Sequence, residues 1–188
     1  MSEPRALPFE FGGRLALDLT WTVRFRAVLP TELLVVPDDL CSWLKAVGLP
    51  APQQASSRDL RDVRELRQAI HRAATAAINR GAVSETDRSL LNRWAANPAP
   101  FPVLAGDGTL GVTSPARKEV AAALSAIARD AIELLAKQPD GRLRRCSGPQ
   151  CSLLFYDDSR PGARRWCSTE RCGNKVNTKA YRQRRRDT

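Results

Sequence analysis

Four cysteines near the carboxyl-terminal end constrain this chain more than any other feature. Four residues separate Cys146 from Cys151, four separate Cys167 from Cys172, and fifteen lie between the two pairs. A short loop with turn-forming residues brings two sulfurs onto one side of a metal ion, and zinc takes four thiolates in a tetrahedron with Zn–S distances of ~2.3 Å. The spacing therefore predicts one structural zinc ion, Zn²⁺, held by all four cysteines.

Two other uses of these thiols stay open from the residues alone. Two disulfide bonds could join them, but the first residues lack the basic-then-apolar pattern of a secretory signal, and thiols inside the cell stay reduced. An iron–sulfur cluster also takes four thiolates, although the familiar cluster spacings are tighter and less symmetric. Because no stretch approaches the ~18 apolar residues that cross a bilayer, we expect a cytoplasmic protein with no membrane partner.

Charge is spread very unevenly along the chain and marks a domain boundary. Residues 142–188 hold 13 of the 30 Lys and Arg residues and 4 of the 20 Asp and Glu residues, a net charge of +9 against +1 for the remainder. The turn Pro139-Asp140-Gly141 precedes this basic segment. We therefore expect two domains, residues 1–140 and residues 141–188. The second is so short that it requires a staple, which the metal supplies.

The first domain reads as mostly helical. The apolar pattern and the end signals predict helices over residues 38–47, 58–80 and 84–97, and from the Ser114-Pro115 start to about residue 138. Gly106-Asp107-Gly108 between two short apolar runs predicts a β-hairpin. The fold class is thus mainly α with small β-hairpins (α+β), a helical domain followed by a small treble-clef or zinc-ribbon-like finger. Within the finger, Leu153–Tyr156 is expected to pair with Arg164–Trp166.

The basic segment predicts a polyanionic partner. If the chain is helical from Ser168, cations recur on one face at spacings of four, three and four residues, and a polyanion would offset their mutual repulsion. Nucleic acid is the favoured partner, DNA ahead of RNA, and a solvated tail is the alternative; the segment lacks the apolar face of a membrane-surface helix. The candidate nucleic-acid-binding residues are Arg164, Arg165, Asn174, Lys175, Lys179, Arg182, Arg184, Arg185 and Arg186.

The finger residues resemble a known family. The run from Cys167 to Lys175, after the Leu-Phe-Tyr-Asp-Asp-Ser run that begins at Leu154, resembles the CGNR zinc finger, with Lys175 in place of the arginine that gives the family its last letter. The upstream chain resembles the ABATE domain that precedes this finger, with Trp21 standing in place of an asparagine. The resemblance implies a bacterial stress-induced transcription regulator, zinc on the four cysteines, and a DNA-binding finger.

Catalysis has little support in the sequence. His71 is the single histidine, which excludes multi-histidine metal centres and leaves one candidate imidazole base, so we expect a protein that is not an enzyme. Asp18, Trp21 and Trp43 are candidates for lining a ligand pocket, and an enzyme or ligand-binding protein with a purely structural finger is the alternative from another class. The helical domain could bind a small-molecule effector, a protein, or a second copy of itself as a homodimer.

Overall fold

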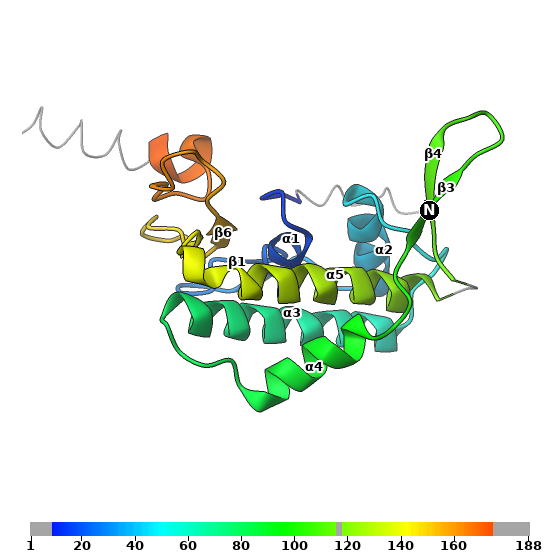
Figure 1. Cartoon of the computed structure of the whole chain (residues 1–188), viewed down its shortest axis with the longest axis horizontal. Helices are drawn as coiled ribbons and strands as arrows, with labels where there is room; N and C mark the ends of the chain where they lie inside the picture. Colours follow the sequence, from blue (N-terminus) through cyan, green and yellow to red (C-terminus); the bar gives the residue numbers. More distant parts are fainter. Residues whose placement is uncertain (1–8, 116–117, 175–188) are drawn as a thin grey trace, which may run out of the picture.

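A computed structural model describes residues 9–115 and 118–174. In this part of the chain α5 lies along α3, with α1 and α2 to one side and α4 to the other (Figure 1). The three strand pairs are short and antiparallel. The predicted fold class, mainly helical with small hairpins and a cysteine-bearing finger, is confirmed. The helices are α1 (Leu15–Thr20), α2 (Pro37–Ala46), α3 (Ser57–Ile78), α4 (Glu85–Ala95) and α5 (Glu119–Ala136).

Side-chain caps set the starts of α3 and α4. The Ser56 hydroxyl accepts a hydrogen bond from the Asp59 N–H, and the Asp59 carboxylate accepts one from the Ser56 N–H in return. Ser84 caps α4 in the same way through the Asp87 N–H. Such caps satisfy N–H groups that have no partner inside the helix. The predicted starts of both helices are confirmed to within one residue.

The starts of α2 and α5 differ from the prediction. α2 begins at Pro37, where the Asp39 carboxylate accepts hydrogen bonds from the N–H groups of Val35 and Val36, so Asp39 stabilises the helix start rather than Asp38. α5 begins at Glu119 after Lys118, later than the Ser114-Pro115 signal indicated.

Apolar faces of α1, α2, α3 and α5 form the main core, which consists mostly of leucine and alanine and holds one buried tryptophan, Trp43 of α2. The apolar face of α3 is buried from Leu60 to Ala74, and with it one cation, Arg67, which is 1% exposed. Arg67 donates hydrogen bonds to both carboxylate oxygens of Glu32, at 2.6 and 2.5 Å, and to the Thr22 hydroxyl. This bidentate pair fixes α3 to the hairpin of β1 (Val23–Arg24) and β2 (Thr31–Glu32), which the sequence did not indicate.

The predicted hairpin around Gly106-Asp107-Gly108 is confirmed as β3 (Phe101–Leu104) paired with β4 (Leu110–Thr113). Its side chains stay largely exposed, Leu104 to 80% and Leu110 to 78%. Figure 1 shows this hairpin extending from one end of the molecule, opposite the finger.

Strand pairing in the finger differs from the prediction. β6 (Leu154–Tyr156) pairs with β5 (Leu143–Arg145) and not with Arg164–Trp166, so that expectation is wrong. The reason is that Cys146 and Cys151 lie in the turn between the two strands, and the Cys146 N–H donates to the Leu153 carbonyl to extend the ladder. The metal-binding turn is therefore itself the hairpin turn. Two short helices complete the described elements, η1 (Gln138–Asp140) and the π-helical turn η2 (Thr169–Gly173), which is capped by Ser168.

The finger packs directly on the helical domain. Leu143 and Leu154 of its two strands join one apolar cluster with Leu17 of α1 and Ala74 of α3. Trp21, one residue beyond α1, enters the core of the finger and donates a hydrogen bond from Nε1 to the Leu154 carbonyl at 2.7 Å. The charge boundary near residue 140 is therefore crossed by a shared core.

Candidate metal centre

The four predicted thiols meet at one point in the finger. The Sγ atoms of Cys146, Cys151, Cys167 and Cys172 all lie within 4.8 Å of one another. Cys167 Sγ is 3.7 Å from Cys151 Sγ and 3.8 Å from Cys172 Sγ. Two sulfurs on a tetrahedron of radius ~2.3 Å are separated by about 3.8 Å, so these spacings fit a single zinc ion.

The same distances do not fit the disulfide alternative, because bonded sulfurs are ~2.0 Å apart, and all five cysteines are free in the structure. The fifth, Cys41, is buried in the helical core as a small apolar side chain.

Backbone geometry brings the two cysteine loops together. The Cys151 N–H donates to the Gly148 carbonyl at 2.9 Å, which closes the first loop as a turn. A Cβ at Gly148 would lie 3.0 Å from Cys151 Cβ and 3.1 Å from Cys172 Sγ, so a side chain there would push into the cluster. The Cys167 N–H also donates to Cys146 Sγ at 3.3 Å. Glycine at position 148 is therefore a requirement of the site.

Crowding of the sulfurs changes their acidity. Hydrogen bonds from the Cys151 and Cys167 thiols lower the pKa of Cys146 to about 2, while the contact with Cys146 raises the pKa of Cys151 to about 12. Hydrogen bonds with these two neighbours also raise the pKa of Cys167. Four thiolates this close together repel one another and require a cation among them.

A buried carboxylate holds the loop after β6 in place. Asp157 accepts hydrogen bonds from the Ser159 N–H, the Ser159 hydroxyl and the Arg164 N–H. Burial alone raises the pKa of Asp157, but these donors outweigh it and lower the pKa below the ordinary value. Arg144 lies 3.9 Å from the same carboxylate. Asp157 and Ser159 therefore stabilise the turn after β6.

Two of the candidate nucleic-acid-binding arginines differ in their surroundings. Arg164 binds internally: it donates to the Cys167 carbonyl, pairs with Asp158 at 3.0 Å and lies over the Phe155 ring. Arg165 is exposed, and its guanidinium lies 5.1 Å from the centroid of the Trp166 ring. Asn174 is exposed at the end of the described chain. The remaining candidates, Lys175, Lys179, Arg182, Arg184, Arg185 and Arg186, lie outside the described residues.

The three candidate pocket residues do not share a cavity. Trp43 is fully buried in the helical core, because α2 packs its apolar face inward. Trp21 lies beside a cavity of ≈ 590 Å³ together with Phe9 and Cys167, but its ring chiefly fills the finger core. Asp18 is buried, and its carboxylate accepts a hydrogen bond from the Gly12 N–H at 2.5 Å, so it does not face a cavity. Trp21 thus joins the two domains. The one signal of this role in the sequence was the tryptophan itself, at a position where the family resemblance leads one to expect asparagine.

The buried Asp18 carboxyl predicts a pH effect on stability. Burial, reinforced by the negative charge of Asp130, raises the pKa of Asp18 to about 6. The folded state therefore favours the protonated form, so stability is full below about pH 4 and falls as the pH rises through 6. We expect Asp18→Asn, which mimics that form, to raise the free energy of unfolding at pH 7 by about 1–2 kcal/mol, and by almost nothing at pH 4.

Urea unfolding of both proteins from pH 4 to pH 7 measures this difference. Burial and nearby arginines lower the pKa of His71 to about 4, so His71 makes the stability of both proteins rise with pH in the same range. The difference between the two proteins removes this shared contribution. A difference between the two proteins that does not change with pH would contradict the assignment.

The geometry defines a class of protein: a helical domain joined to a four-thiolate zinc finger. Comparison with known families agrees. Residues 13–138 match the ABATE family, described as "Putative stress-induced transcription regulator", and residues 142–185 match the CGNR zinc finger. The chain belongs to the ABATE family and carries a CGNR zinc finger with one structural zinc. No curated protein matches it.

Proposed function

We propose that this protein is a DNA-binding transcription regulator of the bacterial cytoplasm, in which the finger contacts DNA and the helical domain senses a signal or binds a partner. Membership of a family described as transcription regulators supports the proposal, and so does the basic finger. Among the described residues no helix is long and apolar enough to cross a membrane.

One observation carries the proposal: the metal centre fixes exposed arginines that pair with no carboxylate of the described chain. Arg160 and Arg165 are exposed on the loops around the cysteines. Arg144 and Arg164, in contrast, are held by internal carbonyls and by Asp157 and Asp158. A rigid platform with free guanidinium groups is suited to phosphate oxygens.

We propose a binding role rather than catalysis for the helical domain. Its carboxyl with a raised pKa, Asp18, faces a backbone N–H and not an open cavity. Its β3–β4 hairpin presents exposed apolar side chains, and a hairpin of this size is marginal in water without a partner. These features support a sensing or interaction role, including a contact between two copies.

The affinity for duplex DNA as a function of salt tests the proposal. The logarithm of the binding constant should fall linearly with the logarithm of salt concentration, by about 0.9 for each phosphate contacted. Replacing Lys179, Arg182 and Arg186 together by glutamine should reduce this slope by about 2–3 and leave the zinc content unchanged. The matched control replaces three exposed arginines of the helical domain, Arg58, Arg61 and Arg93. An equal loss of DNA affinity in both triple variants, or a wild-type affinity that does not change with salt, would contradict the proposal that the finger binds DNA.

RNA is the second candidate partner because of Trp166. Its ring is half-buried and lies beside the Arg165 guanidinium. An unpaired base can stack on such a pair of flat groups. Competition between duplex DNA and a structured RNA for the zinc-loaded chain separates the two. Preference for RNA together with a loss on Trp166→Ala would favour this candidate.

A further inference from the structure

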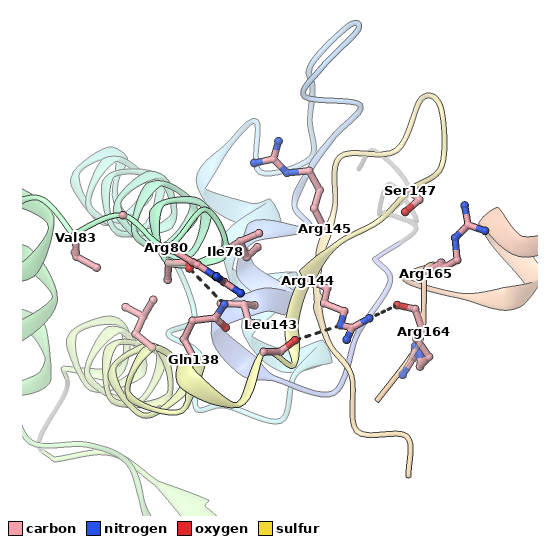
Figure 2. A pocket seen from close by; sticks show the side chains of 14 residues that line it. Ile78, Arg80, Val83, Gln138, Leu143, Arg144, Arg145, Ser147, Arg164 and Arg165 are labelled. Atoms are coloured by element: carbon pink, nitrogen blue, oxygen red, sulfur yellow. Dashed lines mark hydrogen bonds between the residues drawn. The ribbon is translucent and has the colours of Figure 1, made fainter. Parts of the chain in front are cut away.

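An open groove of ≈ 940 Å³ lies where the helical domain meets the finger. Its walls come from the ends of α3 and α5 on one side, and from β5 and the loops around the cysteines on the other. Figure 2 shows arginines from both sides of this junction around it. Five arginines line the groove, and none of the described residues that line it is acidic: Arg80, Arg144, Arg145, Arg164 and Arg165.

Three of these arginines are available to a ligand. Arg144 donates to backbone carbonyls of the finger loop, and Arg164 is held as described above. Arg145 has a single long contact, to the Thr75 hydroxyl at 3.5 Å, and Arg165 lies over an aromatic ring. For Arg80 no side-chain hydrogen bond or ion pair is found within the described chain. Three exposed guanidinium groups without carboxylates therefore border one groove.

The backbone of Arg80 is a second and independent observation. Arg80 follows the last residues of α3 with φ +58°, in the left-handed region. Its N–H donates to the Ala77 carbonyl, and the next residue, Gly81, donates to the Ala76 carbonyl, which is the usual way a helix ends on a left-handed residue. Glycine normally takes that position, since a side chain there is strained, and strained residues cluster at ligand sites. The chain places an arginine at the left-handed position and the glycine one residue later.

The floor of the groove is aliphatic. Ile78, Val83 and Leu135 are half-buried, and Leu143 is buried beneath them. A phosphodiester backbone is polar along its whole length and gains little from such a floor. An organic molecule with an apolar body gains from it by burial, while its anionic group meets the arginines. The volume and the place at a domain junction are typical of small-molecule sites.

We propose that the groove between the helical domain and the finger binds a small organic anion, a carboxylate or phosphate ester on an apolar body, through Arg80, Arg145 and Arg165. Arg80 belongs to the helical domain, whereas Arg145 and Arg165 belong to the finger. One ligand therefore contacts both domains and favours the arrangement in which they are packed together. The site shares Arg165 with the proposed DNA contact, but Arg80 and Arg145 are not part of that contact, so the two roles can be tested separately.

The first experiment uses 8-anilinonaphthalene-1-sulfonate, an anion with an apolar body, as the fluorescent probe of the zinc-loaded full chain. We expect saturable binding that weakens at least tenfold in Arg80→Gly combined with Arg145→Gln. Arg80→Gly suits the left-handed backbone, so the variant should keep or raise its melting temperature. Arg58→Gln with Arg61→Gln is the matched control, because it removes the same charge from exposed positions at the other end of α3. Unchanged probe affinity in the groove variant, as expected for a probe seated on the exposed hairpin, would overturn the proposal.

Competition then tests whether both halves of the ligand are recognised. Phenyl phosphate should displace the probe at a concentration at least tenfold lower than inorganic phosphate does. Equal competition by the two would show that the floor contributes nothing, and would overturn the proposal in favour of a polyanion track. The affinity of the groove variant for duplex DNA should stay at the wild-type value, and a parallel loss of DNA binding would assign the groove to nucleic acid instead.

Discussion

Cys167→Ser is expected to release the metal and unfold the finger. The Cys167 sulfur lies 3.7–3.8 Å from two of the other three cluster sulfurs, so its removal leaves three ligands and an open position. Small zinc units without metal are usually unfolded, and apparent metal-binding energies of ~10–16 kcal/mol are also folding energies. We expect at least a hundredfold loss of zinc affinity, measured by competition with a chelator.

Cys41→Ser is the matched control for this variant. Cys41 is a buried cysteine of the helical core and is remote from the cluster. Its replacement should cost some stability but leave one zinc per chain. Retention of zinc at unit stoichiometry in Cys167→Ser, or its loss in Cys41→Ser, would contradict the assignment of the ligands.

Loss of the finger should also weaken the helical domain. Trp21 buries its ring among finger residues and donates to the Leu154 carbonyl, and Leu17 packs on the finger strands. These contacts disappear when the finger unfolds. Helical circular dichroism of Cys167→Ser should therefore persist but melt at a lower temperature than that of the wild type.

Glu32→Ala is expected to destabilise the helical domain by about 3 kcal/mol, because it leaves the Arg67 guanidinium buried without its carboxylate. Arg67 is 1% exposed on its side chain, whereas Glu32 keeps 32% of its side chain exposed, which holds the effect at the lower end of the range for buried pairs. Urea unfolding followed by circular dichroism measures the loss.

Two variants separate the buried charge from simple loss of packing. Arg67→Met combined with Glu32→Leu removes both charges and should recover most of the lost stability. Glu85→Ala breaks the exposed pair with Arg88 and should change little. A loss in Glu32→Ala no larger than in Glu85→Ala would show that the buried pair does not hold α3 to the hairpin of β1 and β2.

Local signals in the sequence were enough to predict much of this structure. The apolar pattern predicted α3, and the Ser84 start signal predicted α4, since both signals depend on residues three or four apart. The cysteine spacing predicted the metal site because each short loop carries two ligands and the tetrahedron leaves few alternatives.

Contacts between distant segments could not be predicted in this way. β5 and β6 pair because the first cysteine loop is their turn, while the sequence equally allowed β6 to pair with the segment after it. Trp21 looked like a pocket residue because its partner carbonyl lies 133 residues further along the chain. The groove joins Arg80 to the finger only after the two domains pack, so no short window of sequence contains it.

X-ray absorption at the zinc edge of the purified full chain tests the central claim most directly, since it counts the atoms around the metal. The account predicts one zinc per chain with four sulfur neighbours at about 2.3 Å. Fewer than four sulfurs, nitrogen or oxygen in their place, or native protein without zinc and with cross-linked cysteines would contradict it.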